Sequence, residues 1–540
     1  MQLRSKPSAA TISLSPVTGA LLASLSSNRL RESPDEYTKL NVSRAVSFLA
    51  LMYEKLRNSV EYRESHLLRR AAIERILRRR LALNPGARNK AEQIVRELLW
   101  ARYFPKNSLG TDDVDSVQHL LDRYTRIRDY VCKGKKEETR NALSSFLIEM
   151  LSCEIEETLA PVDAGRERLY TYYLFQTLRD RVALEGVDTE LKDVCLFIAL
   201  EKAYRKSDRA YLRYHLYELL AEPVSQHTDA LLEKLLPSME STFRRIDGYI
   251  REPIVDKLVR YGKRQLPPYL ILFDILNDNL TGAEEILSET TTLWKEVEKR
   301  CIERYAELKK QVRTMTIRSI IYILVLKLIF AVLVEYPISL VIGDDGTIIP
   351  IILNILIAPI LLVLIVATFR MPDSDNTRRM YDRIIQIIQR DPHNEKRIAL
   401  VHRHYPGKNR VLYNIFTVLY IVAFGLILYG IHLLLSFLEF SYISQAVFVL
   451  FLSVAVFFSH RIKLQINELM VVEREGIMRP LFDFFVIPLV RVGKFFDETM
   501  SRFNFLAIIF DFIIEAPFKL IIDIIEEWIS FIRKKREDIV

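Results

Sequence analysis

Three long stretches without a charged residue constrain this chain more than any other feature. Residues 347–369 form an uncharged run of 23, residues 411–437 a run of 27 with one histidine, and residues 440–459 a run of 20. A helix needs about 20 apolar residues to cross the hydrocarbon core of a bilayer. Residues 319–341 are equally apolar apart from Lys327 and Glu335. The sequence therefore predicts four transmembrane helices, at about 319–341, 347–369, 411–437 and 440–459.

The loops between these runs predict the orientation. Residues 370–410 hold ten Lys and Arg side chains, whereas the two short turns on the other side hold only the acids Asp344, Asp345 and Glu439. Lys and Arg gather in short loops on the cytoplasmic side of a membrane. We therefore expect two hairpins in a cell (inner or plasma) membrane, with both termini and the basic loop 370–410 in the cytoplasm.

The region before the membrane runs predicts an all-α fold. Glycine is scarce, at 16 of 540 residues, and apolar positions in residues 34–312 recur at the three- and four-residue spacing of amphipathic helices. Prolines and glycines break this region into segments typical of a helical bundle or an irregular α-solenoid. A cytoplasmic helical domain is thus expected over 34–312, after a Ser- and Pro-rich, disordered tail over 1–33. The capping pattern at Thr281–Glu284 predicts a long helix that continues into the membrane.

The C-terminal region, 461–540, is predicted to be cytoplasmic and to carry interfacial amphipathic helices. Acids recur along 503–532 at spacings of mostly four, which places them on one face of a helix. Charges at the centre of a spanning helix cost about 2.5–3.5 kcal/mol each, so this helix is expected to lie on the membrane surface. Its acidic face is expected to meet protein, simple solvation being the alternative. The acidic stripe comprises Asp511, Glu515, Asp523, Glu526 and Glu527.

Polar residues within the predicted spans are candidate functional positions. Lys327 and Glu335 lie eight residues apart in span one, and Asn354 lies between two prolines in span two. Ionisable groups at membrane depth are costly and often mark transport paths. The alternative, which we weigh more heavily, is that Lys327 pairs with Glu335 or with a polar group of another helix.

An arginine-rich helix near the start of the cytoplasmic domain is a candidate binding face. Such a face can hold the phosphates of lipid headgroups or contact a protein partner. The net charge of +8 fits contact with anionic lipid as well as with nucleic acid, but nucleic acid is an unlikely partner because the predicted spans place this face near anionic lipid. The alternative is a solvated face with local Glu–Arg pairs. The residues are Arg69, Arg70, Arg75, Arg78, Arg79 and Arg80.

No catalytic, metal-binding or cofactor-binding motif stands out. Phosphate-binding loops, dinucleotide fingerprints, zinc-protease helices and nucleophile elbows are missing from the sequence. The four cysteines, Cys132, Cys153, Cys195 and Cys301, have neither metal-ligand nor redox spacing. We therefore expect a non-enzymatic, membrane-anchored helical scaffold that binds a protein partner or anionic lipid, or forms a homo-oligomer. The alternative is an oligomeric channel or transporter whose path is lined by spans one and two.

Overall fold

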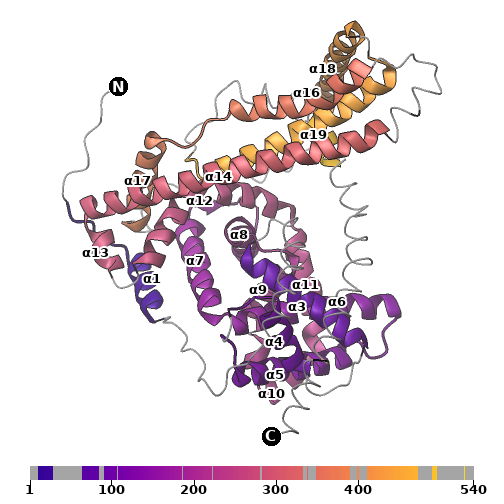
Figure 1. Cartoon of the computed structure of the whole chain (residues 1–540). Helices are drawn as coiled ribbons and strands as arrows, with labels where there is room; N and C mark the ends of the chain where they lie inside the picture. The colour runs from indigo at the N-terminus through magenta and orange to yellow at the C-terminus, as the bar shows by residue number, and fades with distance from the viewer. Residues whose placement is uncertain are drawn as a thin grey trace. The chain divides into compact units, whose positions relative to one another are not determined.

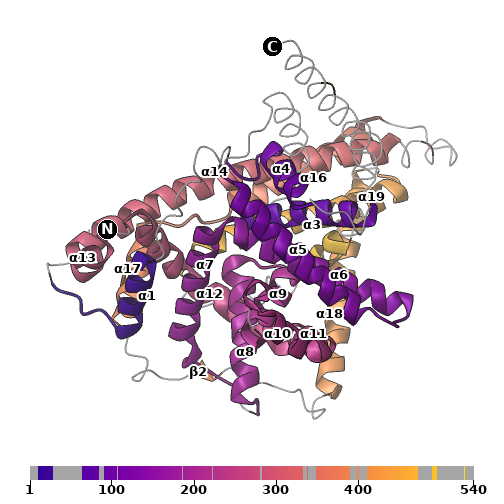
Figure 2. The ribbon, with the colours of Figure 1, turned by 90° about the horizontal axis from the view of Figure 1, so that it is seen from below.

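The computed structural model is almost entirely helical, which confirms the all-α fold class (Figures 1 and 2). The described strands, β1 (Val182–Ala183) and β2 (Ile398–Ala399), pair in parallel over only two residues each. The described residues divide into two compact units. The structure describes residues 10–27, 64–83, 90–105, 108–184, 186–221, 223–279, 282–332, 337, 348–389, 398–399, 410–438, 440–471, 489–495 and 528.

The first unit, here called the helical unit, consists mainly of Leu14–Lys263. Its α-helices are α1 (Pro16–Ser27), α3 (Ser65–Leu83), α4 (Lys90–Trp100), α5 (Thr111–Val131), α6 (Glu137–Leu159), α7 (Pro161–Arg179), α8 (Thr189–Leu200), α9 (Arg209–Ala221), α10 (Asp229–Leu235), α11 (Met239–Arg251) and the start of α12 (Pro253–Asp278). A π-helical turn, η1 (Glu201–Arg205), follows α8, and the 3-10 turns η2 (Val224–Gln226) and η3 (Leu236–Ser238) flank α10.

Helix α6 is the central helix of this unit. It packs against α3, α5, α7 and α9, and seven of its last eight residues, 152–159, are buried. A helix buried all round usually carries apolar residues on every face. Here Glu154, Glu156 and Glu157 are among the buried residues, so their carboxylates need partners inside the protein.

The N-terminal segment corrects the predicted disordered tail. Residues 10–27 are ordered, and α1 packs on α7 through Leu21 and Leu25, both of which are buried. The hydroxyl of buried Thr18 lies 2.9 Å from that of Tyr173 on α7. The small, polar composition of this segment predicted disorder, but a preformed helical surface supplies the apolar contacts that order it.

The second unit, here called the apolar unit, consists mainly of Arg264–Arg390 and Arg403–Ala507. Its helices are the end of α12, α13 (Ala283–Ser288), α14 (Thr290–Phe330), α16 (Ile348–Ala367), α17 (Ser374–Ile388), α18 (Arg410–Phe437) and α19 (Tyr442–Asn467). The expected long helix is present as α14, 41 residues without a break. It begins later than predicted because extended Glu289 separates it from α13.

The predicted basic loop 370–410 contains a well-packed helix. The apolar face of α17 includes Met380 and Ile384, which are fully buried. The buried Asn376 amide donates to the Tyr305 hydroxyl at 2.7 Å and to the Leu469 carbonyl at 2.8 Å, and its oxygen accepts from the Val471 amide at 2.9 Å. This side chain therefore ties α17 to α14 and to the end of α19.

Helices α14, α16 and α19 pack lengthwise around one apolar cluster (Figure 1). Helices α14 and α19 run antiparallel, as shown by ring contacts of Tyr322 with Phe458 and of Phe330 with Phe451. The middle of α19 also contacts the short helical segment 489–495. A side chain at Gly493 would lie 2.2 Å from the Ser453 carbonyl oxygen, so only glycine fits this crossing.

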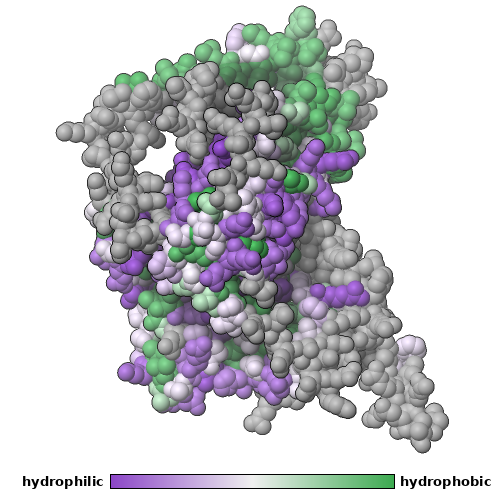
Figure 3. All heavy atoms as spheres, turned by 90° about the vertical axis from the view of Figure 1, so that its left-hand side faces the viewer, coloured by the Kyte–Doolittle hydropathy of each residue, from purple (hydrophilic) through white to green (hydrophobic). Residues whose placement is uncertain are grey.

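Among the described residues, two helices of the apolar unit are long and apolar enough to cross a membrane, by length and composition. They are Thr417–Phe437 within α18 and Tyr442–Asn467, which is α19; Ile355–Ala367 in α16 is apolar but shorter. The outward faces of α14, α16 and α18 carry large exposed apolar side chains, and Figure 3 shows hydrophobic residues gathered over this part of the surface.

Candidate functional site

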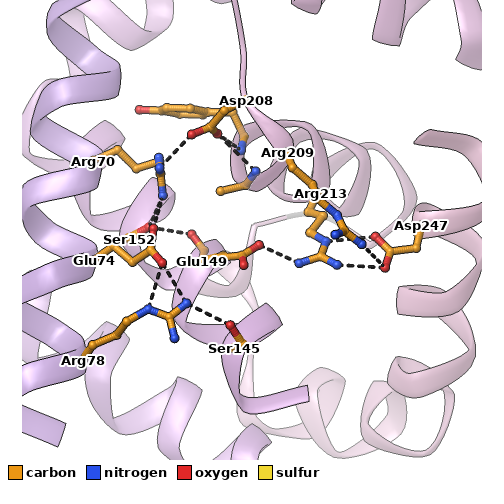
Figure 4. Close-up of polar contacts among 12 residues, drawn as sticks. Arg70, Glu74, Arg78, Ser145, Glu149, Ser152, Asp208, Arg209, Arg213 and Asp247 are labelled. Atoms are coloured by element: carbon orange, nitrogen blue, oxygen red, sulfur yellow. Dashed lines mark hydrogen bonds and ion pairs between the residues drawn. The ribbon is translucent and has the colours of Figure 1, made fainter. Parts of the chain in front are cut away.

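The arginines of α3 are held by partners within the helical unit (Figure 4). Arg70 pairs with Glu74 at 2.6 Å and with Asp208 at 2.7 Å, where Asp208 also accepts from two backbone amides at the start of α9. Arg78 pairs with the other oxygen of Glu74 and donates to the Ser145 hydroxyl of α6 at 2.8 Å. Figure 4 thus shows α3 joined to α6 and to α9 by charged side chains.

The remaining members of the predicted basic face behave similarly. Arg69 pairs with Glu156 of α6 at 2.6 Å, Arg79 pairs with Glu97 of α4, and Arg75 donates to the Tyr103 hydroxyl at 3.3 Å. Arg80 lies in α3, but its side chain is outside the described part of the structure. The pairs of Arg70 and Arg78 with Glu74 are local, as the alternative interpretation expected, whereas Arg69 and Arg79 pair with acids of other helices. Lipid or partner binding by this face stays a prediction.

A second arginine cluster links α9 to α6 and α11. Arg213 pairs with Glu149 of α6 at 2.6 Å and with Asp247 of α11 at 2.8 Å, and Arg209 shares the Asp247 carboxylate at 2.9 Å (Figure 4). The Arg213 guanidinium also stacks over the Phe146 ring at 4.2 Å. These contacts fix the position of α9, which carries a deeply buried histidine.

That group is His215, which lies between two buried carboxylates. Its Nε2 is 2.9 Å from Glu157 Oε1 and its Nδ1 is 3.0 Å from Glu201 Oε2. Burial lowers the pKa of His215, but the carboxylates of Glu201 and Glu157 outweigh burial and the nearby Arg205 guanidinium and raise the pKa to about 9. His215 is therefore an imidazolium that donates from both ring nitrogens at neutral pH.

Two arginines complete this network. Arg205 pairs with Glu157 at 3.1 Å and approaches Glu201 at 3.8 Å, while Arg168 of α7 contacts Glu157 and lies 2.8 Å from Glu218. Burial raises the pKa of Glu201, but its partners prevail and hold the pKa at about 2; His215 and the arginines likewise hold the pKa of Glu157 well below its usual range. With His215 protonated, three cations face three carboxylates; we call these six residues the central ion network: Glu157, Arg168, Glu201, Arg205, His215 and Glu218.

The backbone beside this network is unusual. Glu201 and Arg205 sit at the two ends of the π-helical turn η1, which ends at Lys206 in the left-handed conformation with φ 56°. A non-glycine residue in that region costs about 1 kcal/mol or more, and π-helical turns inside helices often occur at functional sites. The extra residue in this turn sets Glu201 and Arg205 on the side that faces His215.

The network includes a group with metal-ligand spacing. Ligand atoms of Glu157, His215 and Glu218 lie within 4.8 Å of one another. A histidine ligand must be neutral, however, and here both ring nitrogens face carboxylates that raise its pKa. Arg168 also neutralises both of the carboxylates that a cation would need. The arrangement favours internal ion pairing over metal binding.

A shallow groove of about 320 Å³ lies between α1 and α7. It is lined mainly by apolar and small residues, with Tyr172 as its exposed aromatic side chain. Its lining includes no acid, histidine or cysteine to act in acid–base or nucleophilic chemistry. The groove shares no lining residue with the central ion network.

Lys327 lies inside the apolar cluster of the second unit. Its side chain is fully buried, with Nζ 5.3 Å from the centre of the Phe451 ring and 5.8 Å from that of Phe448, both on α19. An ammonium group over aromatic faces is stabilised by cation–π attraction. This packing places Lys327 between α14 and α19, in agreement with an interhelical contact.

The structure describes the other predicted candidate residues only in part. Asn354 lies in α16, with its side chain outside the described residues, and Glu335 is not described. The acidic stripe also lies outside the described residues: Asp511, Glu515, Asp523, Glu526 and Glu527. Their proposed roles stay predictions.

Sequence reasoning missed the central ion network and a smaller polar cluster between α18 and α19. In the latter, His432 Nδ1 lies 2.6 Å from Gln445 Oε1, and the Gln445 amide donates to the Phe440 carbonyl at 2.9 Å. The segment Ser152–Glu157 offered one signal, since it places three acids within six residues of one helix. Comparisons with protein-family models, with curated proteins and with solved structures find no match to this chain.

Proposed function

We propose that this protein is a multi-span membrane protein whose helical unit is a non-enzymatic scaffold for a protein partner. The observation that carries the membrane assignment is the exposed apolar surface of α18. Ten of its large apolar side chains are exposed, from 52% for Leu433 to 85% for Phe437. A continuous apolar surface of this kind is unfavourable in water and is typical of a face covered by lipid or protein.

The neighbouring helices support the same assignment. Apart from isolated Ile302, exposed apolar residues on α14 begin at Ile317 and continue past its end to Val332, and α16 exposes Leu356, Ile360 and Leu364. Residues 328–369 and 411–459 contain no Lys or Arg, whereas residues 370–410 contain ten. This asymmetry supports the predicted two-hairpin topology, with the basic segments and both termini in the cytoplasm.

The scaffold role is supported by how charges are used in the helical unit. The buried carboxylates and guanidiniums pair with one another and join α3, α6, α7 and α9. A buried ion network satisfied in this way favours one rigid arrangement of helices rather than a reactive site. The partner surface would then be an outer face of the unit; in a homo-oligomer, copies of the chain would share it.

Two experiments test the proposal, one for membrane insertion and one for partner binding. Full-length protein is expected to stay in the membrane pellet after alkaline carbonate extraction; release into the supernatant would contradict the membrane assignment. Purification in mild detergent, with mass spectrometry of bound proteins, is expected to recover a stoichiometric partner that is lost when residues 14–263 are removed. A partner-free homo-oligomer would instead favour a channel or transporter.

A substitution at Lys327 tests the channel or transporter class directly. Its complete burial against Phe448 and Phe451 supports a packing role, because a group lining a water-filled path would be hydrated. Lys327→Leu is therefore expected to leave partner recovery unchanged. Ion flux in liposomes that is present in the natural protein and lost in Lys327→Leu would contradict the scaffold proposal.

A further inference from the structure

We propose that basic side chains at one end of the apolar helices bind the headgroups of anionic phospholipids. This inference rests on the proposed membrane insertion and adds the lipid class and the residues that select it. The residues, here called the basic collar, are Lys309, Lys310, Arg313, Arg318, Arg370, Arg461 and Lys463.

Packing within the apolar unit brings the collar residues to the same end of the apolar helices. Tyr322 of α14 contacts Phe458 of α19, and further along the same pair of helices Val312 and Ile462 belong to one apolar cluster. Lys463 Nζ lies 5.9 Å from the centre of the Phe369 ring, next to Arg370. Three segments far apart in sequence therefore present basic side chains beside one another.

The collar side chains face outward. Six of the seven are exposed, and Lys463 is half-buried. Among the described residues, Lys309, Lys310, Arg313, Arg370 and Arg461 make no ion pair. The arginines of α3 differ in this respect, because acids of the helical unit hold them. The five collar side chains without an ion pair among the described residues, rather than the arginines of α3, carry the positive charge that an anionic surface attracts.

The position of the collar identifies a lipid headgroup as its partner. Apart from Ile302, which stands alone, the exposed apolar side chains on α14 begin at Ile317, directly beside Arg318. At 1.5 Å per residue, Lys309 lies about 12 Å along the helix from Ile317, whereas the headgroup layer of one leaflet is about 5–8 Å deep; the remaining gap is shorter than the screening length of about 10 Å at 0.1 M salt. A group of exposed cations at the edge of an apolar surface matches the phosphates of a leaflet that holds anionic lipid.

A matched pair of variants tests the collar in the full-length protein. Lys309→Gln with Lys310→Gln removes two collar charges. Lys295→Gln with Lys299→Gln removes two exposed lysines on the same helix, about 16–21 Å further from the apolar surface, which exceeds the screening length at 0.1 M salt. Each protein is reconstituted in phosphatidylcholine vesicles with 20% phosphatidylglycerol, and spin-labelled lipids report the association constant of each lipid class.

We expect the natural protein and the Lys295/Lys299 variant to prefer phosphatidylglycerol. The Lys309/Lys310 variant should lose about fivefold in that preference for each charge, the factor that corresponds to about 1 kcal/mol per lysine near an anionic surface. Equal preference in all three proteins, or an equal loss in both variants, would overturn the collar proposal. Flotation with pure phosphatidylcholine vesicles separates the two proposals, because failure to float contradicts membrane insertion whereas insertion without lipid preference contradicts only the collar.

Discussion

Replacing His215 with glutamine tests the central ion network. The variant keeps a polar side chain but removes the positive charge between Glu157 and Glu201. In the folded protein the pKa of His215 rises from 6.5 to about 9, and each pH unit corresponds to 1.36 kcal/mol. Protonation of this fully buried residue therefore stabilises the helical unit by roughly 3 kcal/mol, which is the expected loss in His215→Gln at pH 7.

Hydrogen exchange measured by mass spectrometry reports this loss on the peptides of α6 and α9. A loss of roughly 3 kcal/mol corresponds to about a hundredfold lower protection where exchange requires opening of the unit. His119→Gln is the matched control, because His119 is exposed on α5 of the same unit. It should leave protection unchanged. Similar protection in His215→Gln and in the natural protein would refute the network as a source of stability.

The pH dependence of stability independently checks the direction of the His215 pKa shift. A raised folded-state pKa means that the stabilisation is fully present below about pH 6.5 and is lost as the pH rises through about 9. After correction for intrinsic exchange rates, the difference between natural protein and His215→Gln should therefore shrink over this range. On the acid side, the pKa of Glu201 is held at about 2, so its contribution is present above about pH 4.5 and is lost as the pH falls through about 2. A stability difference that does not change with pH would show that His215 acts by packing alone.

Three further substitutions follow from single contacts. Lys206→Gly should raise the thermal midpoint of the helical unit, because it relieves about 1 kcal/mol of left-handed backbone strain, and an unchanged or lower midpoint would contradict that strain. Gly493→Ala places a Cβ 2.2 Å from the Ser453 oxygen and should expose residues 489–495 to hydrogen exchange, whereas Gly425→Ala, with open space around it, should not. Asn376→Leu leaves buried partners unsatisfied and should destabilise the apolar unit by about 1–3 kcal/mol in detergent thermal unfolding, and an unchanged midpoint would refute its role as a tie.

The features that sequence predicted well depend on local pattern. Helical periodicity identified the all-α class, and the capping pattern at Thr281–Glu284 with the charged run after it predicted a long helix, which is observed as α14. The start of α14 was missed because Glu289 adopts an extended conformation between two helical segments. Helix α1 was missed because its ordering depends on α7, which lies more than 130 residues away in sequence.

The central ion network could not be predicted from local sequence pattern, for a similar reason. Its members come from α6, α7, η1 and α9, and no spacing in the sequence shows that they converge. The sequence predicted that the arginines on α3 form a solvated or ligand-binding face. It could not show their partners, because Asp208 is 138 residues from Arg70 and Glu156 is 87 residues from Arg69. Sequence identified the charges correctly but not which of them are already paired.

The two units place their charged side chains differently. This contrast is the physical argument that the two units occupy different environments. In the helical unit, carboxylates and guanidiniums are buried at considerable desolvation cost, offset only by close pairing with each other. In the apolar unit, large apolar side chains cover the outer faces of α14, α16 and α18, and exposed basic side chains lie at one end. Water would penalise this second arrangement, because exposed apolar surface is unfavourable in water. The proposed bilayer would remove that penalty and supply anions to the basic collar, so one change of solvent would account for both features of the apolar unit.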